Sequence, residues 1–155
     1  MSQGPVLSNT SPLIALMNLG QLWLFEQLFG TVVIAPAVAL EVGPSFALPH
    51  WITQQALALP IAENVSGLSL GAGETETISL AIELGARLVI LDDRPARRKA
   101  QSLGLPVIGI LGVILSAKKR GLITAIKPCL DTLIQNDFRI AQPLYDQILV
   151  DAGEH

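Results

Sequence analysis

The most constraining stretch of the sequence is LVILDDRPARR, residues 88–98, in which an aliphatic run leads into two aspartates and a basic segment. An unbroken aliphatic run without alternation is typical of a strand covered on both faces, as in a parallel sheet. In open α/β sheets, ligands bind beyond the carboxyl ends of the strands. We therefore expect Asp92 and Asp93 to lie at the functional edge of a parallel sheet.

Two adjacent carboxylates at one sheet edge repel each other unless a proton or a cation relieves the repulsion. An ion that prefers oxygen ligands, such as Mg²⁺, is one source of that relief. The alternative is a turn in which one aspartate caps the helix that follows. The residues themselves leave both interpretations open for Asp92 and Asp93.

The rest of the chain alternates short aliphatic runs with helical patterns, which favours an α/β fold with a small parallel sheet of four or five strands. Proline at helix starts and glycine at helix ends mark the boundaries. We predict strands over 6–8, 31–34, 87–91 and 106–109. We predict helices over 12–19, 21–29, 36–42, 47–59 with Trp51 packed inside, 74–84, 95–103 and 110–120, a loop over 64–73, and a helical C-terminal tail over 124–152.

The length of 155 residues predicts one domain, residues 1–155. Half of the residues are hydrophobic, 15% are charged and the net charge is −3, so the chain is not a general nucleic-acid binder of the strongly basic kind. No Lys or Arg precedes Arg87, so any polyanion has to be held locally by the second half of the chain. The apolar excess predicts a homodimer or a covering partner.

Compartment signals in the sequence are few. Cys129 is the only cysteine, so no intramolecular disulfide is possible, which agrees with a reducing compartment. The N-terminal stretch lacks the basic region of a signal peptide. The apolar stretch 105–117 is too short to span a bilayer. We expect a cytoplasmic protein that does not insert into a membrane.

A first acidic candidate begins the helix predicted over 74–84. Glu74 shares a helix face with Ile78 and Ala81, both apolar, so its side chain is expected to point inward. An inward carboxylate at a helix start can serve chemistry, or it can satisfy free backbone N–H groups. Glu76 and Glu83 lie on another face and are expected to be solvated.

Two further candidates follow the first two predicted strands. Asn9 ends the first strand, where its carbonyl oxygen can coordinate a ligand or make an Asx turn. Glu41 follows the second strand on a short, otherwise uncharged helix, and alone it is a weak signal. Arg94, Arg97 and Arg98 form one helix face beside the aspartate pair, which suits phosphate capture or a solvated basic surface.

Three segments together resemble the PIN-domain nucleases, in particular a poorly characterised PIN-like subfamily similar to VapC-type toxins. They are SNTSPLI (8–14), LGAGETETISLA (70–81) and LVILDDRPARRKAQSLGLPVIGILGVIL (88–115). The resemblance runs along nearly the whole chain and implies a three-layer α/β/α fold. The acidic motif positions of the family fall on Asn9, Glu41, Glu74 and the pair Asp92 and Asp93, which it implies as catalytic and metal-binding residues.

The resemblance implies a ribonuclease that depends on Mg²⁺ or Mn²⁺ and hydrolyses RNA phosphodiesters. It also implies the toxin of a toxin–antitoxin pair, with a small antitoxin protein as partner and a homodimeric assembly. Asn9 stands where active members of the family have aspartate, which removes one negative charge from the metal site. The alternative is therefore a catalytically weakened or inactive PIN-like module that acts through protein or RNA binding.

Overall fold

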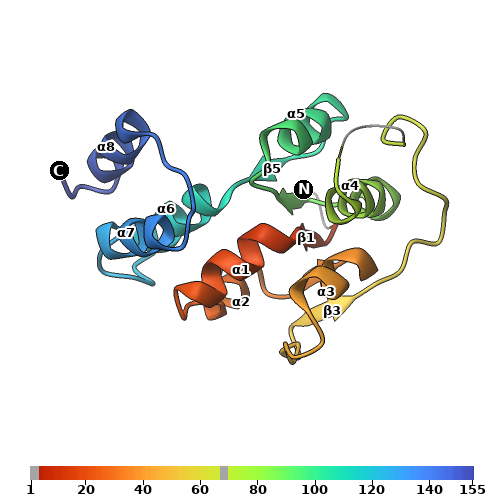
Figure 1. Ribbon diagram of the computed structural model, residues 1–155, viewed down its shortest axis with the longest axis horizontal. Coiled ribbons are helices and arrows are strands. Elements are labelled where there is room, and N and C mark those ends of the chain that lie inside the picture. The colour runs from red at the N-terminus through yellow and green to blue at the C-terminus, as the bar shows by residue number, and fades with distance from the viewer. Residues whose placement is uncertain (1–3, 67–69) are drawn as a thin grey trace.

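The computed structural model describes residues 4–66 and 70–155 and is built around one parallel sheet. The strand order is β3-β2-β1-β4-β5, and every pairing between neighbours is parallel. Figure 1 shows the strands in the middle of the molecule and the C-terminal helices gathered at one end. The strands are β1 (Val6–Ser8), β2 (Val32–Ile34), β3 (Ile52–Gln54), β4 (Leu88–Ile90) and β5 (Val107–Ile108).

Helices cover both faces of the sheet, which confirms the expected three-layer α/β/α architecture. The described residues form the helices α1 (Thr10–Asn18), α2 (Trp23–Phe29), α3 (Pro36–Val42), α4 (Ala72–Leu84), α5 (Arg94–Ser102), α6 (Ile110–Lys119), α7 (Lys127–Gln135) and α8 (Gln142–Asp151). Proline occupies the first turn of α3, α5, α7 and α8, as the sequence pattern predicts. None of the helices in the described ranges is long and apolar enough to cross a membrane.

The core lies where the middle strands are covered from both sides. Leu7 of β1 pairs in register with Val33 of β2 and Val89 of β4, and all three side chains are buried. Burial of such aliphatic side chains stabilises the fold by about 1.5–3 kcal/mol each. The unbroken aliphatic runs of the sequence are therefore explained by strands that are covered on both faces.

The helix predicted over 47–59 is wrong, because part of this stretch forms the edge strand β3. Ile52 is the buried residue of β3, whereas Thr53 and Gln54 are exposed. The carbonyl group of Trp51 accepts a hydrogen bond of 2.9 Å from the N–H of Val32, and Trp51 is half-buried. This strand is stabilised by its pairing with β2, which is distant in the sequence, so the hydrophobic pattern of residues 47–59 does not reveal it. The loop expected over 64–73 includes residues 67–69, which lie outside the described residues.

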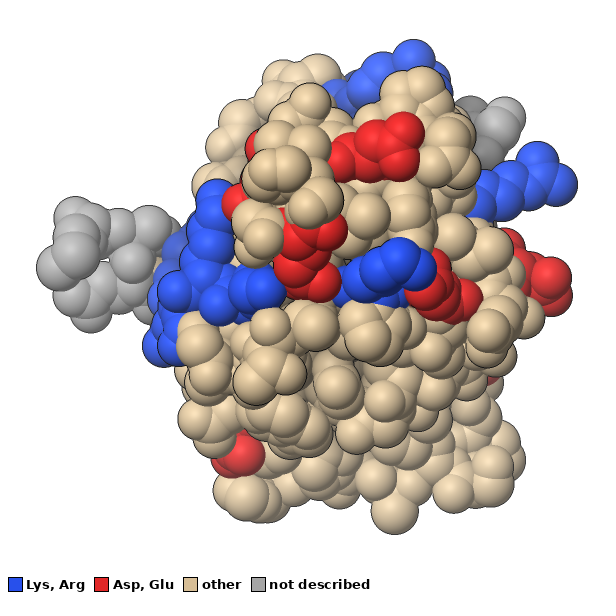
Figure 2. Space-filling model, turned by 90° about the vertical axis from the view of Figure 1, so that its left-hand side faces the viewer, with Lys and Arg blue, Asp and Glu red and all other residues tan. Residues whose placement is uncertain are grey.

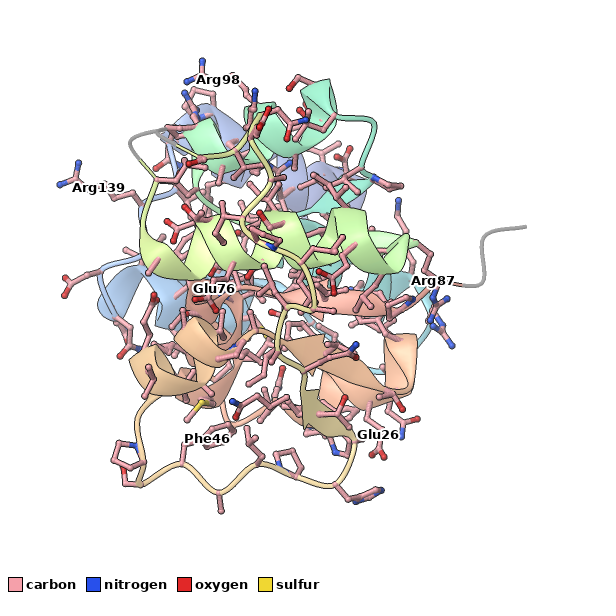
Figure 3. All side chains as sticks on the ribbon, turned by 90° about the vertical axis from the view of Figure 1, so that its right-hand side faces the viewer. Glu26, Phe46, Glu76, Arg87, Arg98 and Arg139 are labelled. Atoms are coloured by element: carbon pink, nitrogen blue, oxygen red, sulfur yellow. The ribbon has the colours of Figure 1, made fainter. Side chains whose placement is uncertain are left out.

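Glu76 and Glu83, which were predicted to be solvated, are half-exposed and also bind backbone N–H groups of other segments. Glu76 Oε1 accepts a 3.0 Å hydrogen bond from the N–H of Ala37, in the first turn of α3, and Figure 3 shows Glu76 between α4 and α3. The carboxylate of Glu83 accepts hydrogen bonds from the N–H groups of Ala58 and Leu59. Both carboxylates therefore anchor neighbouring segments to α4.

The C-terminal end of the chain is anchored by Glu154. Its Oε2 lies 2.8 Å from Nζ of Lys118 on α6 and accepts a 2.7 Å hydrogen bond from the N–H of Ile126, just before α7. The side chain of Glu154 is only 16% exposed. Figure 2 shows the face of the molecule at this end, where acidic and basic side chains lie across the middle and upper parts and the lower part carries few charges.

Candidate functional site

The site forms at the carboxyl edge of the sheet, where β1 and β4 end side by side. Ser8 pairs with Ile90, and the N–H of Asn9 donates a 3.0 Å hydrogen bond to the carbonyl oxygen of Ile90. Asn9 therefore leaves β1 at the level where β4 ends, and Asp92 follows that end by two residues. The parallel pairing thus brings these two predicted residues to the same edge, although they are far apart in the sequence.

The side chains of Glu41 and Asn9 both lie against the first turn of α4. Its Oε1 accepts a 2.9 Å hydrogen bond from the N–H of Gly73, and its Oε2 accepts a 2.7 Å hydrogen bond from Oγ1 of Thr10. A Cβ atom at position 73 would lie 2.6 Å from Glu41 Oε1 and 3.0 Å from Asn9 Oδ1. Only glycine therefore lets the start of α4 approach both side chains this closely.

Two side-chain oxygens of this edge are buried and accept no hydrogen bond from the described residues. They are Oδ1 of Asn9 and Oδ2 of Asp92. A buried polar oxygen without a partner costs about 1–3 kcal/mol. Oxygens of this kind are commonly explained by a water molecule, an ion or a catalytic role. Both residues follow the ends of the neighbouring strands β1 and β4, which points to a ligand at this edge of the sheet.

Asp92 is held in place through its other oxygen. Oδ1 accepts a 2.8 Å hydrogen bond from the N–H of Ile110, the first residue of α6. Burial raises the pKa of Asp92 above its usual value, and the N–H of Ile110 and the charge of Arg97 oppose that rise. A carboxyl group whose charge is disfavoured by burial has much to gain from a bound cation.

The structure separates the roles of the two aspartates. Asp93 is exposed, and its side chain accepts a 3.1 Å hydrogen bond from the N–H of Ala96, so it is the N-cap of α5. Asp92 points into the edge of the sheet, and one of its oxygens has no partner among the residues that the structure describes. The capping alternative, left open by the sequence, therefore describes Asp93, and Asp92 is the aspartate with a free oxygen at the site.

Glu74 takes a different direction from the other acidic candidates. Its Oε2 lies 2.8 Å from where a Cβ atom on Gly71 would be, so its carboxylate folds back over the start of α4. The side-chain atoms nearest to a Cβ on Gly73 belong instead to Glu41 and Asn9. Within residues 4–66 and 70–155, no three Asp, Glu, His or Cys side chains gather closely enough to hold one metal ion.

A cavity of about 460 Å³ opens beside Asp92. Its wall includes Arg94 and Arg97 of α5, and Nη1 of Arg97 donates a 3.0 Å hydrogen bond to the carbonyl oxygen of Leu91. Arg98 does not line this cavity, and Figure 3 shows it projecting away from the body of the molecule. Two of the three arginines proposed from the sequence therefore face the site.

The loop between α7 and α8 supplies two further residues to this cavity, Phe138 and Arg139. The sequence does not distinguish these two residues, because the C-terminal stretch carries only helix signals. Arg139 is exposed and adds a third cation to the wall that already holds Arg94 and Arg97. A carboxylate beside three arginines is suited to a phosphate-bearing ligand held together with a cation.

Comparison with known proteins places the chain in a family. A family model described as a PIN domain matches residues 5–154. The chain belongs to the PIN-domain family. PIN domains have a nuclease-type fold, which implies a nucleic-acid substrate, and they typically depend on divalent metal ions.

Solved structures include one similar protein. It is a PilT N-terminus domain protein, SSO1118, from the hyperthermophilic archaeon Sulfolobus solfataricus P2, with 23% sequence identity and a TM-score of 0.48. The match covers 73% of this chain and 92% of that protein. Among curated proteins, none matches this chain.

The residues of this PIN domain fit a hard divalent cation in chemistry. Mg²⁺ and Mn²⁺ prefer oxygen ligands, and Mg²⁺ usually keeps several water molecules and binds only one or two protein groups. Asn9 Oδ1 and Asp92 Oδ2 are oxygen donors that are buried and unpartnered among the described residues, on neighbouring strand ends. Glu41, by contrast, already uses both carboxylate oxygens in hydrogen bonds to Gly73 and Thr10.

Proposed function

We propose that this PIN domain is a metal-dependent ribonuclease that hydrolyses RNA phosphodiesters at the edge formed by Asn9 and Asp92. The observation that carries the proposal is the pair of buried oxygens Asn9 Oδ1 and Asp92 Oδ2, which lack partners among the described residues; Asp92 also lines the cavity that carries the arginines. The family membership supports a nucleic-acid substrate. We further propose that residues 1–155 act as one PIN domain, which the family match over 5–154 supports.

Asn9 and Asp92 would hold Mg²⁺ or Mn²⁺, and Glu41 and Glu74 would add negative charge to this edge from α3 and α4. A bound divalent ion supplies an activated water at neutral pH and neutralises charge on the phosphate. Glu41 positions the start of α4 through its hydrogen bond with Gly73. Glu74 belongs to the proposed set because it lies in the same first turn as Gly73.

The basic residues around the cavity bind and orient the RNA backbone in this proposal. Arg97 is fixed by its hydrogen bond to the carbonyl oxygen of Leu91, directly before Asp92. Arg94 and Arg139 line the same cavity and can pair with neighbouring phosphates. Arg98 is exposed and makes a weaker contribution through its charge alone.

A second candidate function is a PIN-like module that binds RNA or protein without cleaving. Two observations favour it specifically: position 9 carries a neutral amide, and the described residues contain no group of three metal-ligating side chains of the Asp, Glu, His and Cys types. In this function the arginine-lined cavity would bind RNA, and the weakened acidic site would not hydrolyse it.

One experiment separates the two functions and includes a matched control. Purified protein is incubated with labelled single-stranded RNA in Mg²⁺, Mn²⁺ or EDTA, alongside the variants Asp92→Asn and Asp93→Asn. We expect cleavage only with metal, its loss in Asp92→Asn and its retention in Asp93→Asn, because asparagine is also a good N-cap. RNA binding without cleavage under any of these conditions would replace the nuclease by the binding module.

We also propose that the chain is the toxin of a toxin–antitoxin pair, acts in the cytoplasm, and forms a homodimer. Leu40 is 81% exposed and Leu59 is 62% exposed, and covering either side chain with a second copy or a small antitoxin would favour association. Light scattering at tens of micromolar checks the assembly. A monomer mass throughout that range would contradict the homodimer.

A further inference from the structure

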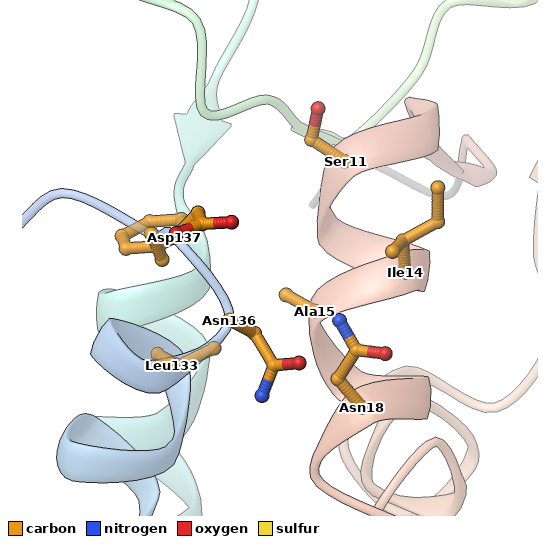
Figure 4. Close-up of a pocket in the computed structure, with 8 residues that line it drawn as sticks. Ser11, Ile14, Ala15, Asn18, Leu133, Asn136 and Asp137 are labelled. Atoms are coloured by element: carbon orange, nitrogen blue, oxygen red, sulfur yellow. The ribbon is translucent and has the colours of Figure 1, made fainter.

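A second cavity, of about 190 Å³, lies between α1 and the end of α7 (Figure 4). Polar groups from both helices line it: Ser11 and Asn18 from α1, and Asn136 and Asp137 from the end of α7. Figure 4 shows Asn18 and Asn136 facing each other across the cavity, with the carboxylate of Asp137 directed toward α1. The volume is below the roughly 300–1,000 Å³ of pockets for drug-sized ligands, so it suits one small group.

Asp137 adopts a left-handed backbone conformation that, among the described residues, is otherwise found only at glycines. Its φ is 68°, and it is the only non-glycine residue with a positive φ in the ranges 4–66 and 70–155. The N–H of Asp137 bonds to the carbonyl oxygen of Ile134, and the N–H of Phe138 bonds to that of Leu133, which is the Schellman arrangement at a helix end. Glycine is the usual residue at this position, so the turn itself does not require a carboxylate.

The cavity adjoins the cavity of the candidate nuclease site through Phe138. Phe138 lines both this cavity and the cavity beside Asp92, and Ser11 follows Asn9 by two residues. The neighbouring cavity carries Arg94, Arg97 and Arg139, whose charges attract phosphate and repel a cationic side chain of a partner protein. An RNA strand bound by these arginines would therefore place a base within reach of Asp137.

We propose that this second cavity is a base-binding subsite that selects guanine in single-stranded RNA, an inference that rests on the proposed action on RNA. Guanine presents the donors N1–H and N2–H₂ side by side, and the carboxylate of Asp137 can accept both. Its O6 can accept from the side-chain amide of Asn18, because the amide nitrogen of Asn136 already donates to the carbonyl oxygen of Thr132. Phe138 supplies an apolar wall for the ring, since single-stranded RNA is commonly bound through stacked bases and their Watson–Crick edges.

Adenine does not satisfy the same groups. It presents an acceptor at N1 and a donor only at its amino group, so its N1 lone pair would face an oxygen of Asp137. A site built to hydrogen-bond one partner rejects an analogue that leaves its polar groups unpaired. One bidentate pair of this kind discriminates by roughly tenfold or more between bases.

The test measures binding without cleavage, so that its result does not depend on metal chemistry. Fluorescence anisotropy in EDTA compares two short single-stranded RNAs that differ by one guanine-to-adenine change in an otherwise uridine sequence. We expect the guanine form to bind about tenfold more tightly. Asp137→Gly and Asp137→Asn should abolish that preference, whereas Asp146→Asn, which changes an exposed aspartate on α8, should preserve it.

The variant Asp137→Gly is expected to fold normally, because glycine adopts the same positive φ at no steric cost. A lost guanine preference in this variant is therefore not due to unfolding. Its thermal midpoint is expected to equal or exceed that of the native protein. Equal affinity for the two RNAs, or a guanine preference that survives in Asp137→Gly, would overturn the proposal. A guanine preference without metal-dependent cleavage would sustain the subsite and refute only the nuclease function, so the two failures are distinguishable.

Discussion

Asp92 and Ile110 are joined by a hydrogen bond of 2.8 Å, in which the first amide of α6 donates to Oδ1 of the aspartate that follows β4. The bond fixes the carboxylate and leaves Oδ2 buried, without a partner among the described residues, at the edge of the sheet. One oxygen of Asp92 therefore supports the fold, and the other is available to a ligand.

Asp92→Asn is expected to keep the fold and abolish cleavage. An amide oxygen still accepts from the N–H of Ile110, but the charge that would bind a cation is lost. Burial raises the pKa of Asp92, so the folded state favours the protonated carboxyl, and the metal-free native protein loses stability as the pH rises through that titration. Chemical denaturation in EDTA should therefore show the variant to be more stable near neutral pH.

This advantage of Asp92→Asn should shrink at a pH below 3.8, the ordinary pKa of the group, because the native carboxyl is then protonated in both the folded and the unfolded state. A constant difference across the whole pH range would show that the charge of Asp92 is not responsible. Full retention of cleavage in the variant would exclude Asp92 from the chemistry.

Asn9→Asp is expected to tighten Mg²⁺ binding and to raise ribonuclease activity. An added charge about 4 Å from a cation is worth several kcal/mol before desolvation, which leaves roughly ten- to a hundredfold in metal affinity. In EDTA the same charge lies close to Glu41 and should lower the thermal midpoint. Isothermal titration calorimetry and thermal denaturation with and without Mg²⁺ check both effects, and Mg²⁺ affinity equal to that of the native protein would contradict them.

Gly73→Ala is expected to destabilise the protein by about 1–3 kcal/mol, although alanine is normally the better residue inside a helix. The new Cβ atom would lie 2.6 Å from Oε1 of Glu41 and 3.0 Å from Oδ1 of Asn9. The shorter side chain in Glu41→Asp should relieve part of the clash. A double-mutant cycle by urea denaturation measures this coupling, and strictly additive effects would refute the contact.

Glu154→Gln is expected to destabilise the protein near neutral pH by about 1 kcal/mol. Burial opposes ionisation of Glu154, but Lys118 and the N–H groups of Ile126 and Lys127 outweigh it and lower its pKa below the ordinary 4.5. A lowered pKa contributes stability above the ordinary value that is lost as the pH falls through the folded-state pKa. The difference between native protein and variant should therefore vanish in acid, as urea denaturation at several pH values can show.

Much of the fold follows from local patterns in the sequence. Aliphatic runs mark β1, β2, β4 and β5, and prolines and glycines mark most helix ends, because these signals act within a few residues. The strand β3 was missed because its stability comes from pairing with β2. The three residues of β3, of which Thr53 and Gln54 are exposed, are too few to show the alternation that would distinguish a strand from a helix.

The sequence by itself determined that Asn9 and Asp92 follow the ends of parallel strands, because the chain order of aliphatic runs decides where each strand stops. Only the tertiary structure decided which of their oxygens are free, that Glu41 is engaged by Gly73 and Thr10, and that Phe138 joins two cavities. These outcomes depend on contacts between residues that are tens of positions apart, and burial and hydrogen bonding at such contacts are properties of the packed molecule.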